Sequence, residues 1–186
     1  KYLLFLIATL FLVTGCSQRQ YFDPEDSVNF NKDSKSIGAD IVSFNRDGAT
    51  LDNGNVITKN GILKNKLPEG YEFINISDDK VIATNNIDKI SIDNEIIEIG
   101  SVIIAATIKD DLLALIHSNN AISLYDLKSK KTLFKEYLGK SFANDMRIAN
   151  PIFMSNILLF PALDGRVSVL SLQNYKIVRN ITVDAD

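Results

Sequence analysis

The chain of 186 residues has little of what catalytic and metal sites usually require, because it holds one cysteine, one histidine and no tryptophan. A single cysteine excludes an internal disulfide and a cysteine-based zinc site. With His117 as its lone histidine, the chain has too few such side chains for most metal centres and nucleophilic sites. The sequence therefore predicts a protein that is not an enzyme, with no catalytic residues, no cofactor and no metal ion.

The chain also lacks a surplus of positive charge. Its net charge is −3 and its pI is about 5.2, and its basic residues form no large cluster. Binding to nucleic acid requires a basic face that neutralises phosphates, so we expect no nucleic-acid partner. Hydrophobic residues make up 46% of the chain and charged residues 23%, which is the composition of a globular protein with a substantial core.

An uncharged, almost wholly apolar run follows Lys1 and covers residues 2–13, YLLFLIATLFLV. A helix of that length measures about 18 Å, shorter than the roughly 30 Å hydrocarbon core of a bilayer. We therefore interpret residues 1–15 as a signal peptide rather than a transmembrane anchor.

The next residues, Val13-Thr14-Gly15-Cys16, resemble the bacterial lipobox, in which an aliphatic residue and two small residues precede a cysteine. This resemblance implies that cleavage makes Cys16 the first residue and that its thiol carries a diacylglyceryl group. Several acyl chains, at about 0.8 kcal/mol per buried CH₂, hold a protein firmly on a membrane. Ser17 and Gln18 resemble the pattern of Gram-negative lipoproteins sent to the outer membrane, which implies a lipid-anchored protein facing the periplasm. The alternative is a secreted protein in which Cys16 has no role.

Residues 16–36 are expected to form a lipidated tether. The stretch has no apolar periodicity, contains Pro24 and carries charges of both signs, as a solvated linker does. Its acidic run from Asp23 to Asp26 could bind a cation, but we interpret it as part of the linker.

From Ile37 onward, short β-branched and aromatic runs alternate with turn signals, and no long stretch has helical periodicity. Asp-Gly and Asn-Gly pairs supply the positive φ angles of tight hairpins. Alignment of Asn119-Asn120 with Asp164-Gly165 gives an offset of 45 residues, within the range of propeller blades. The pattern predicts four blocks of four antiparallel strands, over residues 41–65, 71–99, 101–137 and 151–182.

The predicted fold is an all-β propeller over residues 37–186. A sandwich or jelly roll would require longer Greek-key connections than the short turns seen here. Four blocks fit either a four-bladed propeller or half of a seven- or eight-bladed one, and we favour the half. A half propeller would expose two apolar blade faces.

The fourth block resembles the PQQ-like repeat of quinoproteins. A proline enters the inner strand in Asn150-Pro151-Ile152, an aliphatic second strand follows at residues 156–160, and Asp-Gly precedes an alternating third strand within residues 163–170. The tryptophan common at the end of the fourth strand is missing, and Phe134 and Val178 occupy comparable places.

A lipid-tethered propeller of such repeats resembles the accessory lipoproteins of the outer-membrane β-barrel assembly machinery, the BamB family. That resemblance implies a non-catalytic scaffold whose partners are the membrane, through its lipid, and the assembly components. A periplasmic or surface ligand-binding lipoprotein is the alternative. A quinone-dependent oxidoreductase domain is less favoured, because no cofactor-binding cysteine, tryptophan and acidic set is found.

Other candidate residues are interpreted as structural. His117 ends an apolar strand and is expected to be a hydrogen-bonded core residue rather than a catalytic one. The acid pairs Asp78-Asp79 and Asp110-Asp111 fall at predicted hairpin turns, where short polar side chains bond to local amides. Residues 128–131 are interpreted as a solvated turn rather than a lipid contact.

Overall fold

The computed structural model describes residues 36–141 and 148–182. All the regular secondary structure of these residues is β-strand, and none of them forms a helix that could cross a membrane. The chain divides into two units, Lys1–Ser36 and Ile37–Asp186, and the strands of the described residues belong to the second. The predicted signal peptide, Cys16 and nearly all of the predicted tether lie outside the described residues.

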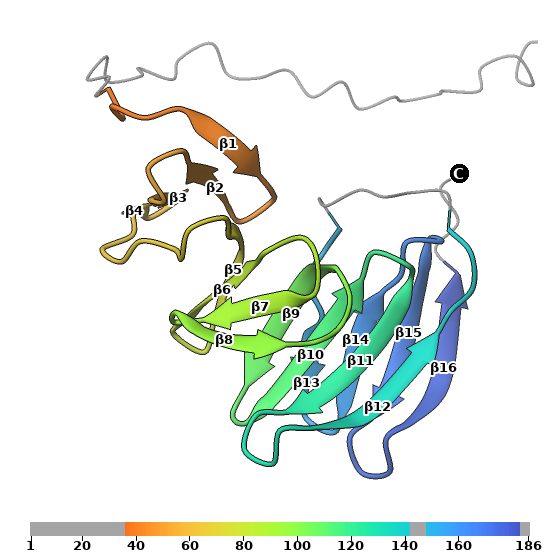
Figure 1. The fold of residues 1–186 in the computed structure, drawn as a ribbon. Coiled ribbons are helices and arrows are strands. Elements are labelled where there is room, and N and C mark those ends of the chain that lie inside the picture. Colours follow the sequence, from red (N-terminus) through yellow and green to blue (C-terminus); the bar gives the residue numbers. More distant parts are fainter. Residues whose placement is uncertain (1–35, 142–147, 183–186) are drawn as a thin grey trace, which may run out of the picture. The chain divides into compact units, whose positions relative to one another are not determined.

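Within the described residues, sixteen strands form four antiparallel sheets, here called blades 1 to 4 (Figure 1). Blade 1 holds β1 (Ile41–Phe44), β2 (Gly48–Leu51), β3 (Val56–Thr58) and β4 (Gly61–Ile62). Blade 2 holds β5 (Glu72–Ser77), β6 (Lys80–Thr84), β7 (Lys89–Ile92) and β8 (Glu95–Glu98). Blade 3 holds β9 (Ile103–Lys109), β10 (Leu112–His117), β11 (Ala121–Asp126) and β12 (Lys131–Tyr137). Blade 4 holds β13 (Ile152–Met154), β14 (Ile157–Pro161), β15 (Arg166–Ser171) and β16 (Lys176–Thr182).

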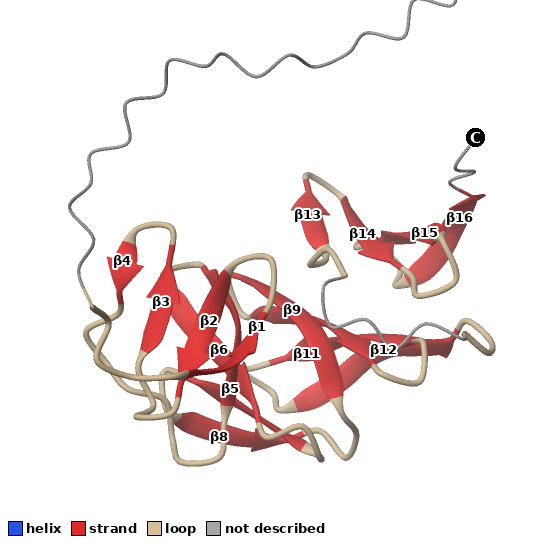
Figure 2. Cartoon of the chain, turned by 90° about the horizontal axis from the view of Figure 1, so that it is seen from above, coloured by secondary structure: helices blue, strands red, loops and turns tan. Residues whose placement is uncertain are grey.

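Each blade is a simple meander, in which every strand pairs with its neighbour in the sequence. Figure 2 shows only strands and loops over the described residues. The all-β class and the four four-stranded blocks predicted from the sequence are therefore confirmed.

The residue types in the hairpin turns explain why the blades lie where the sequence predicts them. Asp78 and Asp79 have φ angles of 53° and 57°, and Asn120 and Gly165 have φ angles of 60° and 80°. Asn, Asp and Gly tolerate this left-handed region better than other residues, so each turn reverses the chain without strain.

Three apolar clusters join the blades. The first fills the space between blades 1 and 2 and includes Val56, Leu67 and Phe73. The second joins blades 2 and 3, with isoleucines of β5, β6 and β7 against β9 and β10. The third joins blades 3 and 4 and includes Phe160, which is fully buried. Because blade 3 has a blade on each side, its inner strands are buried on both faces and read as nearly continuous apolar runs.

Polar bonds link successive inner strands as well. The Ser77 hydroxyl on β5 donates to the Ile108 carbonyl of β9 at 2.7 Å and accepts from the Ile108 amide at 3.0 Å. The Thr107 hydroxyl on β9 donates to the Pro151 carbonyl at 2.7 Å, immediately before β13. These bonds fix the position of blade 2 relative to blade 3 and of blade 3 relative to blade 4.

Gly48 lies in close contact with its own blade and with blade 2. A Cβ atom at this position would lie 2.5 Å from the Ile57 carbonyl oxygen and 2.9 Å from the Phe73 ring. No side chain can be accommodated there without movement of the backbone, so glycine is required at the start of β2.

Blades 1 and 4 each present apolar side chains to solvent. Phe44 of β1 is 68% exposed, and Ile152 of β13 and Val178 of β16 are 52% and 59% exposed. Ile41 and Ile62 of blade 1 and Met154 of blade 4 are exposed in the same way. Blades 2 and 3 expose large apolar side chains as well, such as Ile96 and Tyr137, and the half propeller stays a prediction.

Candidate functional site

The residue predicted to carry lipid, Cys16, lies outside the described residues, and its modification stays a prediction. The structure places the other residues singled out in the sequence. None of the described residues belongs to a group of three or more His, Cys, Asp or Glu side chains able to hold a metal ion.

His117 is buried at the end of β10 between two serines. Its Nδ1 lies 2.6 Å from the Ser101 hydroxyl, and its Nε2 lies 2.7 Å from the Ser123 hydroxyl. Burial, with a smaller contribution from the positive charge of Lys135, lowers the pKa of His117 to about 4. The imidazole is thus neutral at physiological pH, and no carboxylate hydrogen bond orients it.

This Ser–His–Ser arrangement differs from a catalytic dyad in its accessibility. Ser123 is 3% exposed and His117 is 1% exposed, so no substrate can reach either group. The cavity beside them measures about 50 Å³, little more than the space of one or two water molecules. His117 has the structural role that the sequence indicated.

The acid pairs lie in hairpin turns, as expected. Asp78 and Asp79 connect β5 to β6, and Asp110 and Asp111 connect β9 to β10. Asp110 has a φ of 55°, so its role is to reverse the chain. Of these four residues, Asp111 also lines a surface cleft together with Glu95 and Glu98 of β8.

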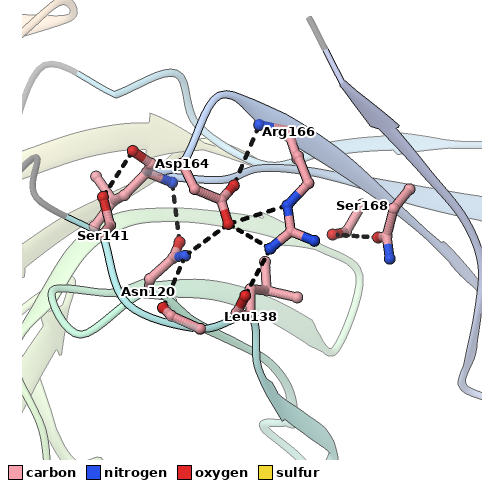
Figure 3. Close-up of polar contacts among 9 residues, drawn as sticks. Asn120, Leu138, Ser141, Asp164, Arg166 and Ser168 are labelled. Carbon is pink, nitrogen blue, oxygen red and sulfur yellow. Dashed lines mark hydrogen bonds and ion pairs between the residues drawn. The ribbon is translucent and has the colours of Figure 1, made fainter.

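A polar network holds blade 3 to blade 4 (Figure 3). Fully buried Asn120, in the β10–β11 turn, donates through Nδ2 to the Asp164 carboxylate at 3.1 Å and to the Gly139 carbonyl at 3.2 Å. Its Oδ1 accepts from the Leu163 amide at 2.9 Å. The whole amide group of Asn120 is therefore satisfied, and it bonds the turn of one blade to the corresponding turn of the next.

Arg166 completes this network from the start of β15. Its guanidinium forms an ion pair with Asp164, with Nε 3.0 Å from Oδ2, and Nη2 donates to the Leu138 carbonyl at 2.6 Å. The hydrogen bonds from Arg166 and Asn120 hold the pKa of Asp164 below its usual value, against the opposing effect of partial burial. Asp164 stays ionised at all physiological pH values.

The alignment of the two turns in the sequence matched Asn119 with Asp164 and Asn120 with Gly165, and it did not indicate that Asn120 and Asp164 touch. The role of Arg166 was missed, because its bond to the Leu138 carbonyl joins residues 28 positions apart and nothing in the sequence indicated that the nearby Asp164 side chain pairs with it. Of the two residues in the place of the missing tryptophan, Phe134 packs against the cluster between blades 3 and 4, whereas Val178 is exposed.

A cleft lies between the outer strand of blade 2 and two turns of blade 3. It measures about 580 Å³ and has apolar and charged lining residues. Its apolar lining includes Ile96, Ile97, Tyr125 and Leu127, and its charged lining Lys80, Asp93, Glu95, Glu98, Asp111, Lys128 and Lys130. Such a mixed surface can bind a peptide segment of another protein.

The fold is that of β-propeller proteins. BamB from Moraxella catarrhalis superposes with a TM-score of 0.57 over 78% of this chain and 49% of that chain, at 17% sequence identity. The apo structure of AztD from Citrobacter koseri superposes with a TM-score of 0.52 over 77% of this chain and 46% of that chain, at 12% identity. The predicted propeller is therefore confirmed, and the sandwich and jelly-roll alternatives are excluded.

The sequence is also similar to a curated bacterial protein. The plasminogen-binding protein PgbB of Helicobacter pylori, in strains 26695 and J99, is 27% identical over the whole of this chain. This chain spans 44% of the length of those relatives. No family model matches the sequence.

Proposed function

We propose that this chain is a non-catalytic, protein-binding part of a lipid-anchored protein of the bacterial cell envelope. We further propose that it acts as a scaffold in the assembly of outer-membrane β-barrel proteins. The observation that carries this proposal is the shared blade architecture with BamB, which extends over 78% of the chain. A shared fold hosts many functions, so the partner must be established by experiment.

The internal construction of the blades is suited to a scaffold. Side-chain bonds between inner strands and the network around Asn120 make successive blades one rigid surface. Rigid surfaces bind with little loss of conformational entropy. The unpaired edges of the outer strands can supply backbone hydrogen-bonding groups to a partner, and the turns between strands can supply charged side chains.

The proposed anchor supports the same role. A diacylglyceryl group on Cys16 would hold the propeller close to the membrane into which barrel proteins insert. A tether of residues 16–36 would let the blades reach a partner at the membrane surface.

Co-purification tests the scaffold proposal. The tagged full-length protein is recovered from mildly solubilised membranes of its own bacterium, and the bound proteins are identified by mass spectrometry. We expect components of the β-barrel assembly machinery, and fewer of them with the unlipidated Cys16→Ser variant at equal expression. Recovery of none of these components with the lipidated protein would refute the scaffold role.

A second candidate function is plasminogen binding at the cell surface. It is favoured by the 27% identity with PgbB, which covers the whole chain rather than one motif. Immobilised protein is titrated with purified plasminogen, and serum albumin serves as the control. Saturable binding of plasminogen alone would favour this function, and its absence together with recovery of assembly components would exclude it.

A further inference from the structure

The outer strand of blade 2 presents an unpaired edge. β8 is the last strand of its sheet and pairs only with β7. The Ile99 amide donates to the Asp88 carbonyl at 2.8 Å, so the backbone N–H of Ile99 points towards the β7 side of the strand. Because backbone groups alternate along an antiparallel strand, the N–H and C=O groups of Ile96 and Glu98 point away from β7.

The 580 Å³ cleft lies beside this edge. Ile97, Tyr125 and Leu127 line it, and these three side chains also pack against the apolar cluster between blades 2 and 3. The cleft is thus an outward continuation of an interblade core, and its apolar lining can accept a further apolar side chain.

The next interface shows what fills the corresponding place. The outer strand of blade 3, β12, is seven residues long and packs Leu133 and Phe134 against the cluster between blades 3 and 4. The outer strand of blade 2 is four residues long and contributes Ile97 in the same way. The cleft exists because β8 is too short to cover the interface.

The two sides of the cleft differ in net charge, because acidic residues outnumber Lys80 on the blade 2 side and lysines outnumber Asp111 on the blade 3 side. Glu95 and Glu98 lie on β8, whereas Lys128 and Lys130 lie in the turn between β11 and β12. Asp126 holds that turn in shape, because its carboxylate accepts from the Lys128 amide at 2.9 Å and from the Ser129 hydroxyl at 2.7 Å. An occupant that crosses the cleft can therefore pair charges of both signs with fixed partners.

The long outer strands of the other blades are less open to pairing. β12 carries Lys131 and Lys135 along its edge, and β16 carries Lys176 and Arg179. Cationic side chains on an edge strand oppose the addition of another strand. β8, with the sequence EIIE, carries none.

We propose that β8 and the adjoining cleft form a docking site for an extended peptide segment of a partner protein. The segment adds to blade 2 as a fifth strand and pairs its backbone with Ile96 and Glu98. One apolar side chain of the segment lies on Ile97, Tyr125 and Leu127, and flanking charged side chains face the lysines or the glutamates. This inference rests on the proposed protein-binding function and assigns its site.

A displayed library of random heptapeptides tests the site, with the full-length chain as bait. The first variant is Ile96→Pro, which removes an outward-facing N–H and is tolerated at an edge position. The second is the pair Lys128→Glu and Lys130→Glu, which leaves the backbone unchanged. Lys176→Glu, on the edge of blade 4, is the matched control, and circular dichroism confirms the fold of each variant.

We expect enriched peptides with alternating apolar and charged residues. Their affinity should fall at least tenfold with Ile96→Pro and with the Lys128/Lys130 variant, and stay unchanged with Lys176→Glu. N-methylation of alternate backbone amides in a synthetic copy should abolish binding, because only strand pairing requires those amides. Peptides that bind both cleft variants as well as the original chain, or no enrichment at all, would overturn the proposal.

The same variants separate this inference from the proposed function. If Ile96→Pro still recovers the assembly components, the chain binds its partner elsewhere and the site on β8 is wrong. If the unaltered chain binds library peptides at β8 but recovers no assembly component, the site stands and the scaffold role is wrong.

Discussion

Removal of the Asn120 side chain should weaken the junction of blades 3 and 4 more than any other single polar truncation there. The side chain makes three hydrogen bonds, to Gly139, Asp164 and Leu163, and is fully buried. At about 1 kcal/mol for each bond, Asn120→Gly should lose about 3 kcal/mol of unfolding free energy. Asn120→Ala should lose about 1 kcal/mol more, because the φ of 60° is unfavourable for alanine.

Urea denaturation followed by circular dichroism measures both variants, since the chain has no tryptophan to report unfolding. Hydrogen exchange of the Leu163 amide, which Asn120 protects in the native protein, reports the local opening of the junction. Asn174→Ala is the matched control, because its exposed side chain accepts one local bond, from Lys176 at 3.2 Å, and its loss should stay below about 0.5 kcal/mol. A loss below about 1 kcal/mol for Asn120→Gly, or equal stability of the Gly and Ala variants, would refute the reasoning.

Three further predictions follow from single residues. The ordinary pKa of His117 is 6.5, and the folded protein lowers it to about 4. The unfolded chain therefore binds a proton more readily than the folded protein, and the free energy of unfolding should fall by about 3 kcal/mol as the pH falls from 6.5 towards 4. His117→Gln should flatten the dependence of unfolding free energy on pH in that window, and an unchanged slope would contradict the assignment. Gly48→Ala should lower stability by about 2 kcal/mol through contact with the Ile57 carbonyl and the Phe73 ring, and an unchanged melting temperature would show that the blades can separate there at no cost. Cys16→Ser should move the protein from the membrane to the soluble fraction and abolish labelling by a radioactive fatty acid, and a membrane-bound Cys16→Ser protein would rule out the lipid anchor.

The blades could be predicted from the sequence because their signals are local. Turn pairs such as Asp78-Asp79 and Asp164-Gly165 determine where each hairpin reverses, and alternation determines which strand lies between two turns. Blade 4 ends at Thr182, the predicted end of the fourth block. The first block, predicted over residues 41–65, ends earlier in the structure, because its last strand β4 stops at Ile62 and Leu63 and Leu67 pack between blades 1 and 2.

The candidate site could not be predicted in the same way. The contacts of Asn120 with Asp164 and of Arg166 with Leu138 join residues that are 44 and 28 positions apart, and they exist only when two blades stack. The cleft beside β8 depends on a difference in strand length between blades 2 and 3, which becomes apparent when the interfaces are compared. Residue types alone indicate neither feature.

Photo-crosslinking in living cells tests the central claim, that a blade edge of this chain binds another protein at the envelope. Benzoylphenylalanine replaces Ile96 at the edge of β8 or, for comparison, Val178 on β16, both of which are more than half exposed. We predict a single defined protein adduct at position 96, identified as a component of barrel assembly or, for a surface binder, as added plasminogen. Irradiated cells that yield no protein adduct at position 96, or the same diffuse adducts at both positions, would contradict the account.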